Sequence, residues 1–352
     1  MNPRPRILAV NPGSTSTRVA LFEGDRCLLE EELRHDVGGS SFDAAELQRR
    51  LEVIRSLLAA HHVDLTALDA VVGRGGLLRP VAGGVYRIND SLLRDAERGV
   101  QGRHPANLGA RMAVELAVDS GAPAFVVDPV SVDEFDDLAR VSGLAGIERR
   151  SLSHALSVRA AVRALAADLD RSWREVRAVV AHLGGGISVC PVRDGRIVDA
   201  NNAISEGPFS PQRSGGLPIQ ELLDLVYSGR HSEAEIRKLT VGEGGLRSYL
   251  GTDDATEVER RIASGDDRAE LHYRALAYQV AKEIGAMATV LEGRLDAIIL
   301  TGGLARSGPL VRWISRRVEH LAPVRVRGTG EMEALAAGVV SALRGEEPVL
   351  DY

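Results

Sequence analysis

The sequence predicts an α/β protein built from two similar halves. A strand–turn–strand–turn pattern occurs twice, alternating helix and strand signals follow each copy, and 352 residues are more than one ordinary hydrophobic core needs. Strands that alternate with helices favour mixed or parallel sheets covered by helices on both faces. Two such halves would leave a cleft between them, where we expect a nucleotide to bind.

The repeated pattern begins with buried apolar strands at residues 7 and 178. The first strand leads to the turn Asn11-Pro-Gly-Ser-Thr-Ser-Thr17, a second strand and a hairpin at Gly24. The other strand leads to His182-Leu-Gly-Gly-Gly186, a second strand and a hairpin at Gly195. Asn11 and Gly24 are 13 positions apart, as are His182 and Gly195. A shared order of strands and turns indicates a duplicated domain.

Helix and strand signals follow each copy. In the first half we expect helices at 41–61, 90–99 and 107–120 and strands at 69–73 and 123–128; in the second, helices at 218–228, 256–265, 268–291 and 310–321 and a strand at 297–301. A last helix at 331–344 is expected to pack back on the first half. We therefore expect one lobe of residues 1–147 plus 331–352 and another of residues 148–330.

Composition excludes several classes of partner. The net charge of −6 gives no basic surface field, so nucleic acid and anionic membrane are not expected as partners. Cys27 and Cys190 match no metal or redox spacing, which favours a reducing, cytoplasmic setting. Neither a signal peptide nor an apolar run of membrane-spanning length is recognisable. An anionic substrate would have to be held by locally placed arginines.

Three glycine-rich turns favour a nucleotide. Such turns expose several backbone N–H groups toward one point and thereby bind anions. The candidate cofactor-binding residues in them are Gly13, Ser14 and Ser16; Gly184, Gly185 and Gly186; and Gly302 and Gly303, beside which an adenosine could lie flat. A single turn of this kind could be a plain hairpin, but three in a duplicated chain favour phosphate binding. The sequence lacks the Gly-x-x-x-x-Gly-Lys-Ser/Thr motif, so this is not a P-loop protein.

Five segments stand in order along nearly the whole chain: Asn11–Arg18, Val72–Gly76, His104–Leu108, His182–Gly186 and Arg213–Gly216. Together they resemble the acetate/butyrate kinase family, and Phe125–Glu134 and Gly207–Pro218 are similar to its butyrate kinase branch. The resemblance implies a duplicated ribonuclease-H-like fold, as in sugar kinases, heat-shock ATPases and actin, with the active site in the interdomain cleft. It also implies ATP and Mg²⁺ as cofactors, a short-chain carboxylate as substrate, an acyl phosphate as product and a homodimer or larger homo-oligomer.

The reaction determines which side chains are needed. A carboxylate is already an anion, so its phosphorylation requires no general base, only alignment and charge neutralisation. The resemblance assigns Arg74 and Arg213 to the carboxylate and the transferring phosphoryl group, and guanidinium geometry suits both. His182 and His154 match family histidines that reach the phosphoryl group. Asp128 would align an arginine and the metal shell.

The resemblance also suggests which residues meet the metal and the phosphates. Asn11 would contact the phosphoryl group or the waters of Mg²⁺, and Glu331 would bind Mg²⁺ through water. Gly330 stands where the family often carries Asn or Asp, which leaves Glu333 as a rival to Glu331. Arg18 stands where lysine is commoner in the family, so the positive charge is kept.

Two departures from the family predict a wide acyl pocket. Gly76 replaces a valine that is usual in acetate kinases, and Ser153 replaces a common phenylalanine. We therefore expect butyrate or a branched C4–C5 acid as substrate, with acetate or propionate as the alternative. A sugar kinase would need an aspartate as base, which Asp128 could supply. A non-catalytic ATP-binding switch of the same fold is a further alternative.

Overall fold

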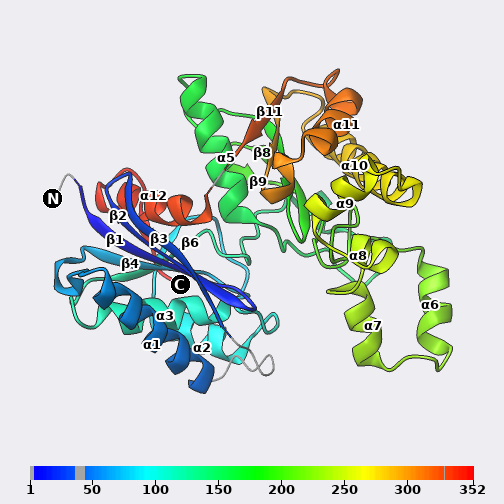
Figure 1. Cartoon of the computed structure of the whole chain (residues 1–352). Coiled ribbons are helices and arrows are strands. Elements are labelled where there is room, and N and C mark those ends of the chain that lie inside the picture. The colour runs from blue at the N-terminus through cyan, green and yellow to red at the C-terminus, as the bar shows by residue number, and fades with distance from the viewer. Residues whose placement is uncertain (1–3, 36–43, 329) are drawn as a thin grey trace. The chain divides into compact units, whose positions relative to one another are not determined.

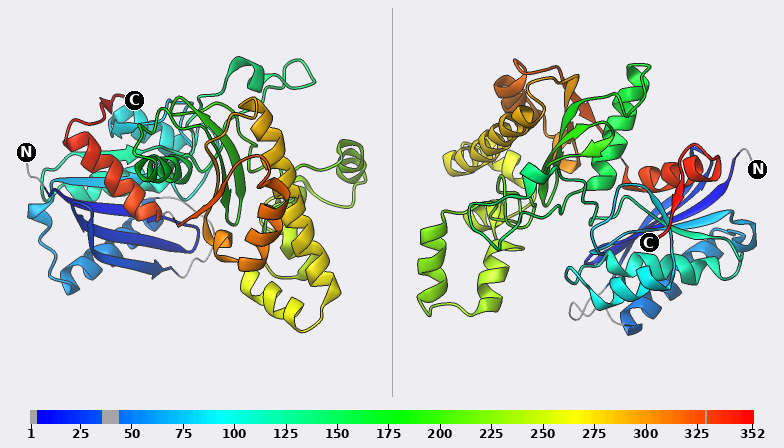
Figure 2. Two further views of the ribbon diagram at one scale, coloured as in Figure 1. Left: turned by 90° about the horizontal axis from the view of Figure 1, so that it is seen from above. Right: turned by 180° about the vertical axis from the view of Figure 1, so that it is seen from behind.

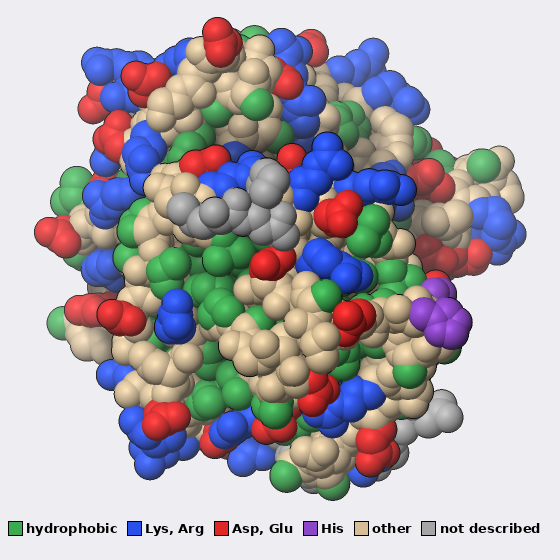
Figure 3. All heavy atoms as spheres, turned by 90° about the vertical axis from the view of Figure 1, so that its left-hand side faces the viewer, with side chains coloured by type: hydrophobic (Ala, Val, Ile, Leu, Met, Phe, Trp, Pro, Cys, Tyr) green, Lys and Arg blue, Asp and Glu red, His purple; other side chains and the backbone are tan. Residues whose placement is uncertain are grey.

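The computed structural model describes residues 4–35, 44–328 and 330–352. Contacts divide the chain into a first unit, Met1–Asp133 with Gly330–Tyr352, and a second unit, Glu134–Thr329 (Figure 1). Within the described ranges, no helix is both long enough and apolar enough to cross a membrane. Basic and acidic side chains are interspersed over the face drawn in Figure 3, in keeping with 43 basic and 49 acidic residues in the sequence.

The first unit contains a seven-stranded sheet of order β12-β5-β6-β4-β1-β2-β3. Its strands are β1 (Arg6–Pro12), β2 (Ser16–Glu23), β3 (Arg26–Arg34), β4 (Ala70–Arg74), β5 (Val85–Arg87), β6 (Ala124–Val127) and β12 (Val349–Leu350). β1, β4 and β6 are parallel to one another, whereas β2 is antiparallel to both of its neighbours. The helices are α1 (Ala44–Ala60), α2 (Asp90–Arg98), α3 (Asn107–Ala117) and α12 (Glu331–Leu343), with a short 3₁₀ turn at Leu65–Ala67.

The two faces of this sheet follow from alternation along β1. Leu8 and Val10 belong to the core that β1 shares with α1 and α3. The intervening residues therefore face the other side, where α12 packs on β1, β4 and β6. Figures 1 and 2 show α12 and α1 on opposite sides of the sheet.

The second unit contains a five-stranded sheet of order β11-β10-β7-β8-β9. Its strands are β7 (Ala178–Leu183), β8 (Ile187–Arg193), β9 (Arg196–Ile197), β10 (Ala297–Thr301) and β11 (Val324–Arg327). Its helices are α4 (Asp137–Arg140), α5 (Ala155–Asp168), α6 (Ile219–Tyr227), α7 (Glu233–Thr240), α8 (Gly245–Leu250), α9 (Ala255–Ala263), α10 (Asp267–Val290) and α11 (Gly308–Val318), with a 3₁₀ turn at Gly303–Arg306. The core of α10 and α11 includes Val179 and Ala181, so His182 lies on the opposite face of β7.

The predicted duplication is confirmed, because the order β6-β4-β1-β2-β3 of the first sheet matches β11-β10-β7-β8-β9 of the second. In both sheets the first three strands form an antiparallel meander and the last two run parallel to the first, which is the ribonuclease-H-like arrangement. The helices cross over between the halves. α5 follows the strands of the first unit but packs on β7 and β10, and α12 follows the strands of the second unit but packs on the first sheet.

The equal spacing of 13 positions is not a residue-by-residue match. The first turn joins the paired residues Pro12 and Thr17, but the second joins Leu183 and Ile187 and is one residue shorter. The hairpins offset this difference. In the first hairpin Glu23 pairs with Arg26, so Gly24 is the first residue of the turn. In the second hairpin Arg193 pairs with Arg196, so Gly195 is the second residue of the turn. The duplication therefore resides in the strand order.

Most expected elements are confirmed to within a few residues. α1 stands for the expected helix 41–61, of which residues 41–43 lie outside the described residues. Several elements were not foreseen: α4, α5, α7, α8, β5, β11 and β12. α7 begins with a capping box between Ser232 and Glu235, a signal that the sequence does display. α5 was missed because the segment around His154 was interpreted only as a site.

The first boundary lies at Asp133 rather than at the expected residue 147. The segment between the two positions bonds to the second unit. The carboxylate of Glu134 accepts the Ile197 N–H at 3.0 Å, and the N–H of Asp136 donates to the Val198 carbonyl at 2.9 Å.

Two helical glycines provide a test of the packing. A Cβ at Gly338 in α12 would lie 2.7 Å from a methyl of Val127, whereas a Cβ at Gly285 in α10 would meet nothing within 4 Å. Gly285→Ala should therefore stabilise the second unit by about 0.5–1 kcal/mol through helix propensity. Gly338→Ala should destabilise the first unit despite the same gain. Calorimetric unfolding of both variants should give opposite shifts in transition temperature; shifts of one sign would contradict this account of α12.

Candidate functional site

Three residues that the sequence singled out form a row on the first sheet. Asn11 of β1 pairs with Arg18 of β2. The pairing of β1 with β4 ends at Val10 and Gly73, so Asn11 and Arg74 are the next residues of these two strands. By alternation all three side chains are on the face that α12 covers. Glu331 is the first residue of that helix. The parallel pairing of β1 and β4 thus brings residues 63 positions apart in sequence to one strand edge.

Glu331 connects this row. Its Oε2 accepts a hydrogen bond from Asn11 Nδ2 at 2.7 Å, and its Oε1 lies 3.6 Å from Nη1 of Arg74. Arg74 is only 5% exposed, so the carboxylate offsets the loss of hydration around the guanidinium. The carboxylate of the rival Glu333 lies against Gly330, the residue before α12, because a Cβ at Gly330 would be 1.5 Å from its Oε2. Of the two glutamates, Glu331 is the one that reaches Asn11 and Arg74.

Asp128 stands at the same edge of the sheet. It follows Val127, which pairs with Arg74, and it is fully buried. Its Oδ1 accepts the Gly84 N–H at 2.8 Å, and its own N–H donates to the Gly84 carbonyl at 2.9 Å. Its φ of +40° lies in the left-handed region, which aspartate tolerates better than most residues. The loop before β5 thereby fixes this carboxylate.

The first glycine-rich turn is closed by Gly13, whose N–H donates to the Ser16 carbonyl at 2.7 Å. The Ser16 hydroxyl donates to Glu32 on β3 at 2.7 Å, so it belongs to the sheet. The carbonyls of Gly13 and Ser14 accept from a buried arginine at 2.8 and 3.3 Å. In a trans peptide the N–H points away from the carbonyl, so the N–H groups of Ser14 and Thr15 point away from that arginine. Two such outward amides are suited to a phosphate oxygen.

The buried arginine is Arg50 of α1, which sequence reasoning missed. Its side chain is 1% exposed, and its Nε donates to Glu46 at 2.7 Å. Its Nη1 also contacts the Thr17 hydroxyl at 3.1 Å. Arg50 lies in line with Leu47, Leu51, Ile54 and Leu58 on the buried face of α1. A cation on an otherwise apolar helical stripe was the signal available in the sequence.

In the second unit the two predicted histidines are in contact. His182 at the end of β7 pairs with Ser188 of β8, and His154 directly precedes α5. Their rings stack with centroids 4.1 Å apart and planes 15° apart. Nδ1 of His154 lies 2.8 Å from the Ser188 hydroxyl. The packing of α5 on β7 therefore sets the orientation of both rings.

Ser153 is turned toward the sheet. It is 3% exposed and lies near the buried thiol of Cys190 on β8, but its hydroxyl has no hydrogen-bond partner among the described residues. Burial raises the pKa of that thiol to about 12, which keeps it protonated. Ser153 is therefore enclosed within the second unit rather than exposed at its surface.

Arg213 lies against the second glycine-rich turn. A Cβ at Gly186 would be 2.5 Å from its Nη1, which donates to the Ala203 carbonyl at 3.0 Å. The Ser210 hydroxyl donates to the Gly185 carbonyl at 2.6 Å and ties the two segments together. Burial lowers the pKa of Arg213, although a guanidinium stays charged. A poorly hydrated cation on a glycine turn is suited to a bound anion.

The third turn stands beside the second. Thr301 of β10 pairs with His182, and Gly302 follows with a φ of +88°. A Cβ at Gly302 would lie 2.5 Å from the Leu183 carbonyl, whereas one at Gly303 would meet nothing within 4 Å. Gly302 therefore serves packing, and Gly303 leaves open space. The same Gly-Gly-Leu sequence follows Arg74, so the duplication extends to the fourth strand of each sheet.

We expected open space beside Gly76, but the structure shows none there. A Cβ there would lie 2.1 Å from Oδ1 of Asn107, which itself accepts the Leu77 N–H at 2.8 Å. The volume that a valine would occupy is taken by Asn107 at the start of α3. In the first unit Gly76 therefore allows α3 to approach the segment after Arg74.

The donors near Asn11 fit Mg²⁺ of a nucleotide complex. Mg²⁺ usually keeps several waters and binds one or two carboxylates together with substrate phosphates. The carboxylate of Glu331 and the amide of Asn11 provide such a partial set. Elsewhere in the described ranges, no group of three or more His, Cys, Asp or Glu residues could hold a metal by itself.

Comparisons with known proteins agree with this architecture. Residues 144–333, more than half of the chain, match the acetokinase family. The chain is similar to the acetate kinase of Porphyromonas gingivalis, with 20% identity, 96% of this chain and 100% of that chain covered and a TM-score of 0.82. It is also similar to a propionate kinase from Francisella tularensis, with 20% identity, 95% of this chain and 98% of that chain covered and a TM-score of 0.75. The acetate kinase of Entamoeba histolytica is 14% identical, with 97% of this chain and 98% of that chain covered and a TM-score of 0.75. At these identities the structural likeness shows the fold.

Replacing Arg50 by methionine tests how the first turn is supported. The change leaves the buried Glu46 without its buried cation, so the free energy of unfolding should fall by about 3–5 kcal/mol. Arg49→Met is the matched control, because Arg49 pairs with the same carboxylate but its side chain is 62% exposed; a change below about 1 kcal/mol is expected. Denaturant unfolding measures both, and equal effects would refute a special role for Arg50.

Proposed function

Because the chain belongs to the acetokinase family, we propose that it transfers the γ-phosphoryl group of ATP to the carboxylate of butyrate or a branched C4–C5 acid. Family membership supports the reaction class, and the transfer is reversible with an acyl phosphate as product. The observation that carries the proposal is the placement of Arg74 and Arg213, each poorly hydrated and each fixed beside a turn at a strand end.

The two arginines are proposed to share one reaction. Arg74 would hold the carboxylate, since Glu331 already fixes its guanidinium beside the end of β4. Arg213 would neutralise the oxygens of the transferring group, since its guanidinium is poorly hydrated and lies on the glycine turn. Planar forks of this kind bind carboxylate and phosphate oxygens in pairs. The acceptor needs no base, and alignment with charge neutralisation completes the chemistry.

The stacked histidines are proposed to contact the phosphoryl group. His182 would donate a hydrogen bond to it, because its ring lies beside Gly184 at the start of the turn. His154 would keep that ring in place by stacking, with its own orientation set by Ser188. Asp128 would preserve the edge of the first sheet through its bonds to Gly84.

Nucleotide binding is proposed at the glycine turns. The amides of Ser14 and Thr15 and the charge of Arg18 would meet phosphates in the first unit, with Gly184, Gly185 and Gly186 doing so in the second. The open side of Gly303 suits an adenosine. Asn11 and Glu331 would hold Mg²⁺ through waters, and the metal, when bound, reduces the negative charge of the phosphates.

The choice of acid rests on sequence. The segments 125–134 and 207–218 are similar to the butyrate kinase branch, which supports a C4–C5 acid. Gly76 adds no support, because Asn107 fills the space beside it, and Ser153 adds none, because it is buried. Acetate or propionate is the alternative that family membership supports equally. Assembly as a homo-oligomer in the cytoplasm is part of the same proposal and rests on the resemblance.

An acid series tests the substrate. Initial rates with Mg-ATP and straight or branched acids of two to six carbons, followed by trapping the acyl phosphate as a hydroxamate, should give the highest kcat/KM for a C4 or C5 acid. Acetate as the best substrate would favour the alternative. Nucleotide binding without any hydroxamate would indicate a non-catalytic ATP-binding protein, and phosphorylation of a sugar would indicate a sugar kinase.

Alanine substitutions test the two arginines. Arg74→Ala and Arg213→Ala should each lower kcat by about 100-fold or more, as the loss of an electrostatic contact to a transferring group does elsewhere. Arg74→Lys should recover only part of the rate, because an ammonium cannot bind two oxygens in one plane. The exposed Arg316 of α11 provides the control Arg316→Ala. A kcat within about threefold of wild type in either alanine variant would remove that arginine from the mechanism.

A further inference from the structure

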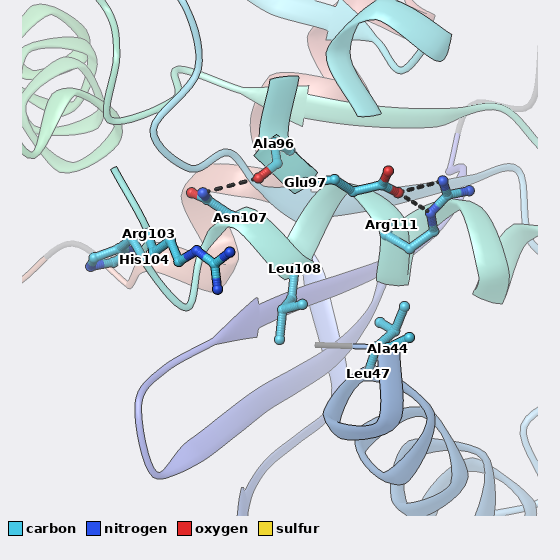
Figure 4. A pocket seen from close by; sticks show the side chains of 9 residues that line it. All are labelled: Ala44, Leu47, Ala96, Glu97, Arg103, His104, Asn107, Leu108 and Arg111. Carbon is cyan, nitrogen blue, oxygen red and sulfur yellow. Dashed lines mark hydrogen bonds and ion pairs between the residues drawn. The ribbon is translucent and has the colours of Figure 1, made fainter. Parts of the chain in front are cut away.

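A cavity of about 320 Å³ opens in the first unit among α1, α2, α3 and the residues that precede α3 (Figure 4). Its volume lies at the lower end of the range of small-molecule sites, roughly 300–1,000 Å³. The sequence analysis assigned no function to it, although His104 and Asn107 of a resembling segment line it.

The cavity is separate from the row of Asn11, Arg74 and Glu331. Successive residues of β4 face opposite sides of the sheet, and Arg74 contacts Glu331 of α12. Its neighbour Gly73 faces α3, since a Cβ there would lie 2.0 Å from the Gly109 carbonyl. The cavity lies beyond α3 and therefore on the other face of the sheet from the Arg74 side chain.

One part of the lining is apolar. Leu47 of α1 and Leu108 of α3 form it, with Ala44 and Ala96 at its margins. In Figure 4 Leu47 and Ala44 lie on one side and Leu108 above them. A chain of a few methylene groups could lie on these side chains and lose its contact with water.

The rest of the lining is polar and contains two cations, Arg103 and Arg111, beside His104, Asn107 and Glu97. Arg103 is exposed, makes no hydrogen bond or ion pair with any described residue, and extends its guanidinium toward Leu108 (Figure 4). Nδ1 of the adjacent His104 accepts the Ala106 N–H at 3.1 Å. The other cation, Arg111, is already bound to Glu97, with 3.1 Å between Nε and Oε1.

We propose that this cavity is a second binding site, for a short aliphatic carboxylate. The carboxylate would bind Arg103, and the aliphatic chain would lie on Leu47 and Leu108. A phosphate fits less well, because Arg111 is neutralised by Glu97 and no second cation is available in the described lining. Each buried methylene should strengthen binding roughly fourfold, so hexanoate, with two more methylenes, should bind roughly 16-fold more tightly than butyrate.

The site adjoins the segment that carries Arg74. Asn107 lines the cavity, and its Oδ1 holds the N–H of Leu77, three residues beyond Arg74. A ligand there would contact the residue that fixes this segment. The proposal does not depend on the proposed reaction, because it concerns binding alone and is tested without nucleotide.

The test is an NMR titration of the full-length protein, labelled at leucine methyl groups, with hexanoate and without ATP. The methyl signals of Leu47 and Leu108 should shift saturably. Arg103→Gln should weaken the affinity at these signals about tenfold, which corresponds to the loss of one charged contact of about 1.4 kcal/mol. Arg98→Gln is the matched control, since Arg98 is exposed on α2 and makes no hydrogen bond or ion pair with the described residues; it should leave the titration unchanged.

Further variants and ligands separate the alternatives. Ala44→Leu narrows the cavity and should weaken hexanoate binding about tenfold or more. Hexanamide, which lacks the charge, should bind wild type more weakly than hexanoate but should match hexanoate in the Arg103→Gln variant. The proposal is overturned if the two leucines do not respond, if they respond equally in Arg103→Gln, if inorganic phosphate alone gives the same shifts, or if Arg74→Ala abolishes them.

Discussion

The parallel pairing of the first and fourth strands in each sheet is the constraint on which the candidate site depends. β1 with β4 brings Asn11 next to Arg74, and β7 with β10 brings His182 next to Thr301. Since side chains at the carboxyl ends of parallel strands emerge at one edge, a duplicated strand order produces two equivalent edges. The chemistry of the two edges then diverges through substitution, with amide and guanidinium in one unit and imidazole and hydroxyl in the other.

Buried arginines give these edges their rigidity, and each is compensated differently. Arg50 has a carboxylate at 2.7 Å and three carbonyls, so it supports a turn and retains little attraction for an added anion. Arg74 has one carboxylate at the longer distance of 3.6 Å. Arg213 has only the Ala203 carbonyl among the described residues. The affinity left for a bound anion should therefore increase from Arg50 to Arg74 to Arg213.

Much of the fold could be predicted from the sequence, because the strand and turn patterns are local and occur twice. Arg18, Asn11 and Arg74 could be selected from their motifs, but their common face follows from strand pairing over long distances. The support of the first turn by Arg50 and the filling of Gly76 by Asn107 could not be predicted. Both depend on which helix packs against a strand end, and that is set by the complete core. For the same reason Gly76 was expected to widen a pocket, whereas Asn107 occupies the space.

The packing of α12 on the first sheet, although it follows the strands of the second unit, has a consequence for biosynthesis. Residues of the first unit up to Asp133 are translated 198 positions or more before Glu331 and the helix that covers β1 and β4. At typical elongation rates of about 5–20 residues per second, the first sheet waits roughly 10–40 s for this helix. During that interval Arg74 lacks its carboxylate and one apolar face of the sheet lacks its cover. The nascent chain is thus most exposed to chaperones and to aggregation through the half that is translated first.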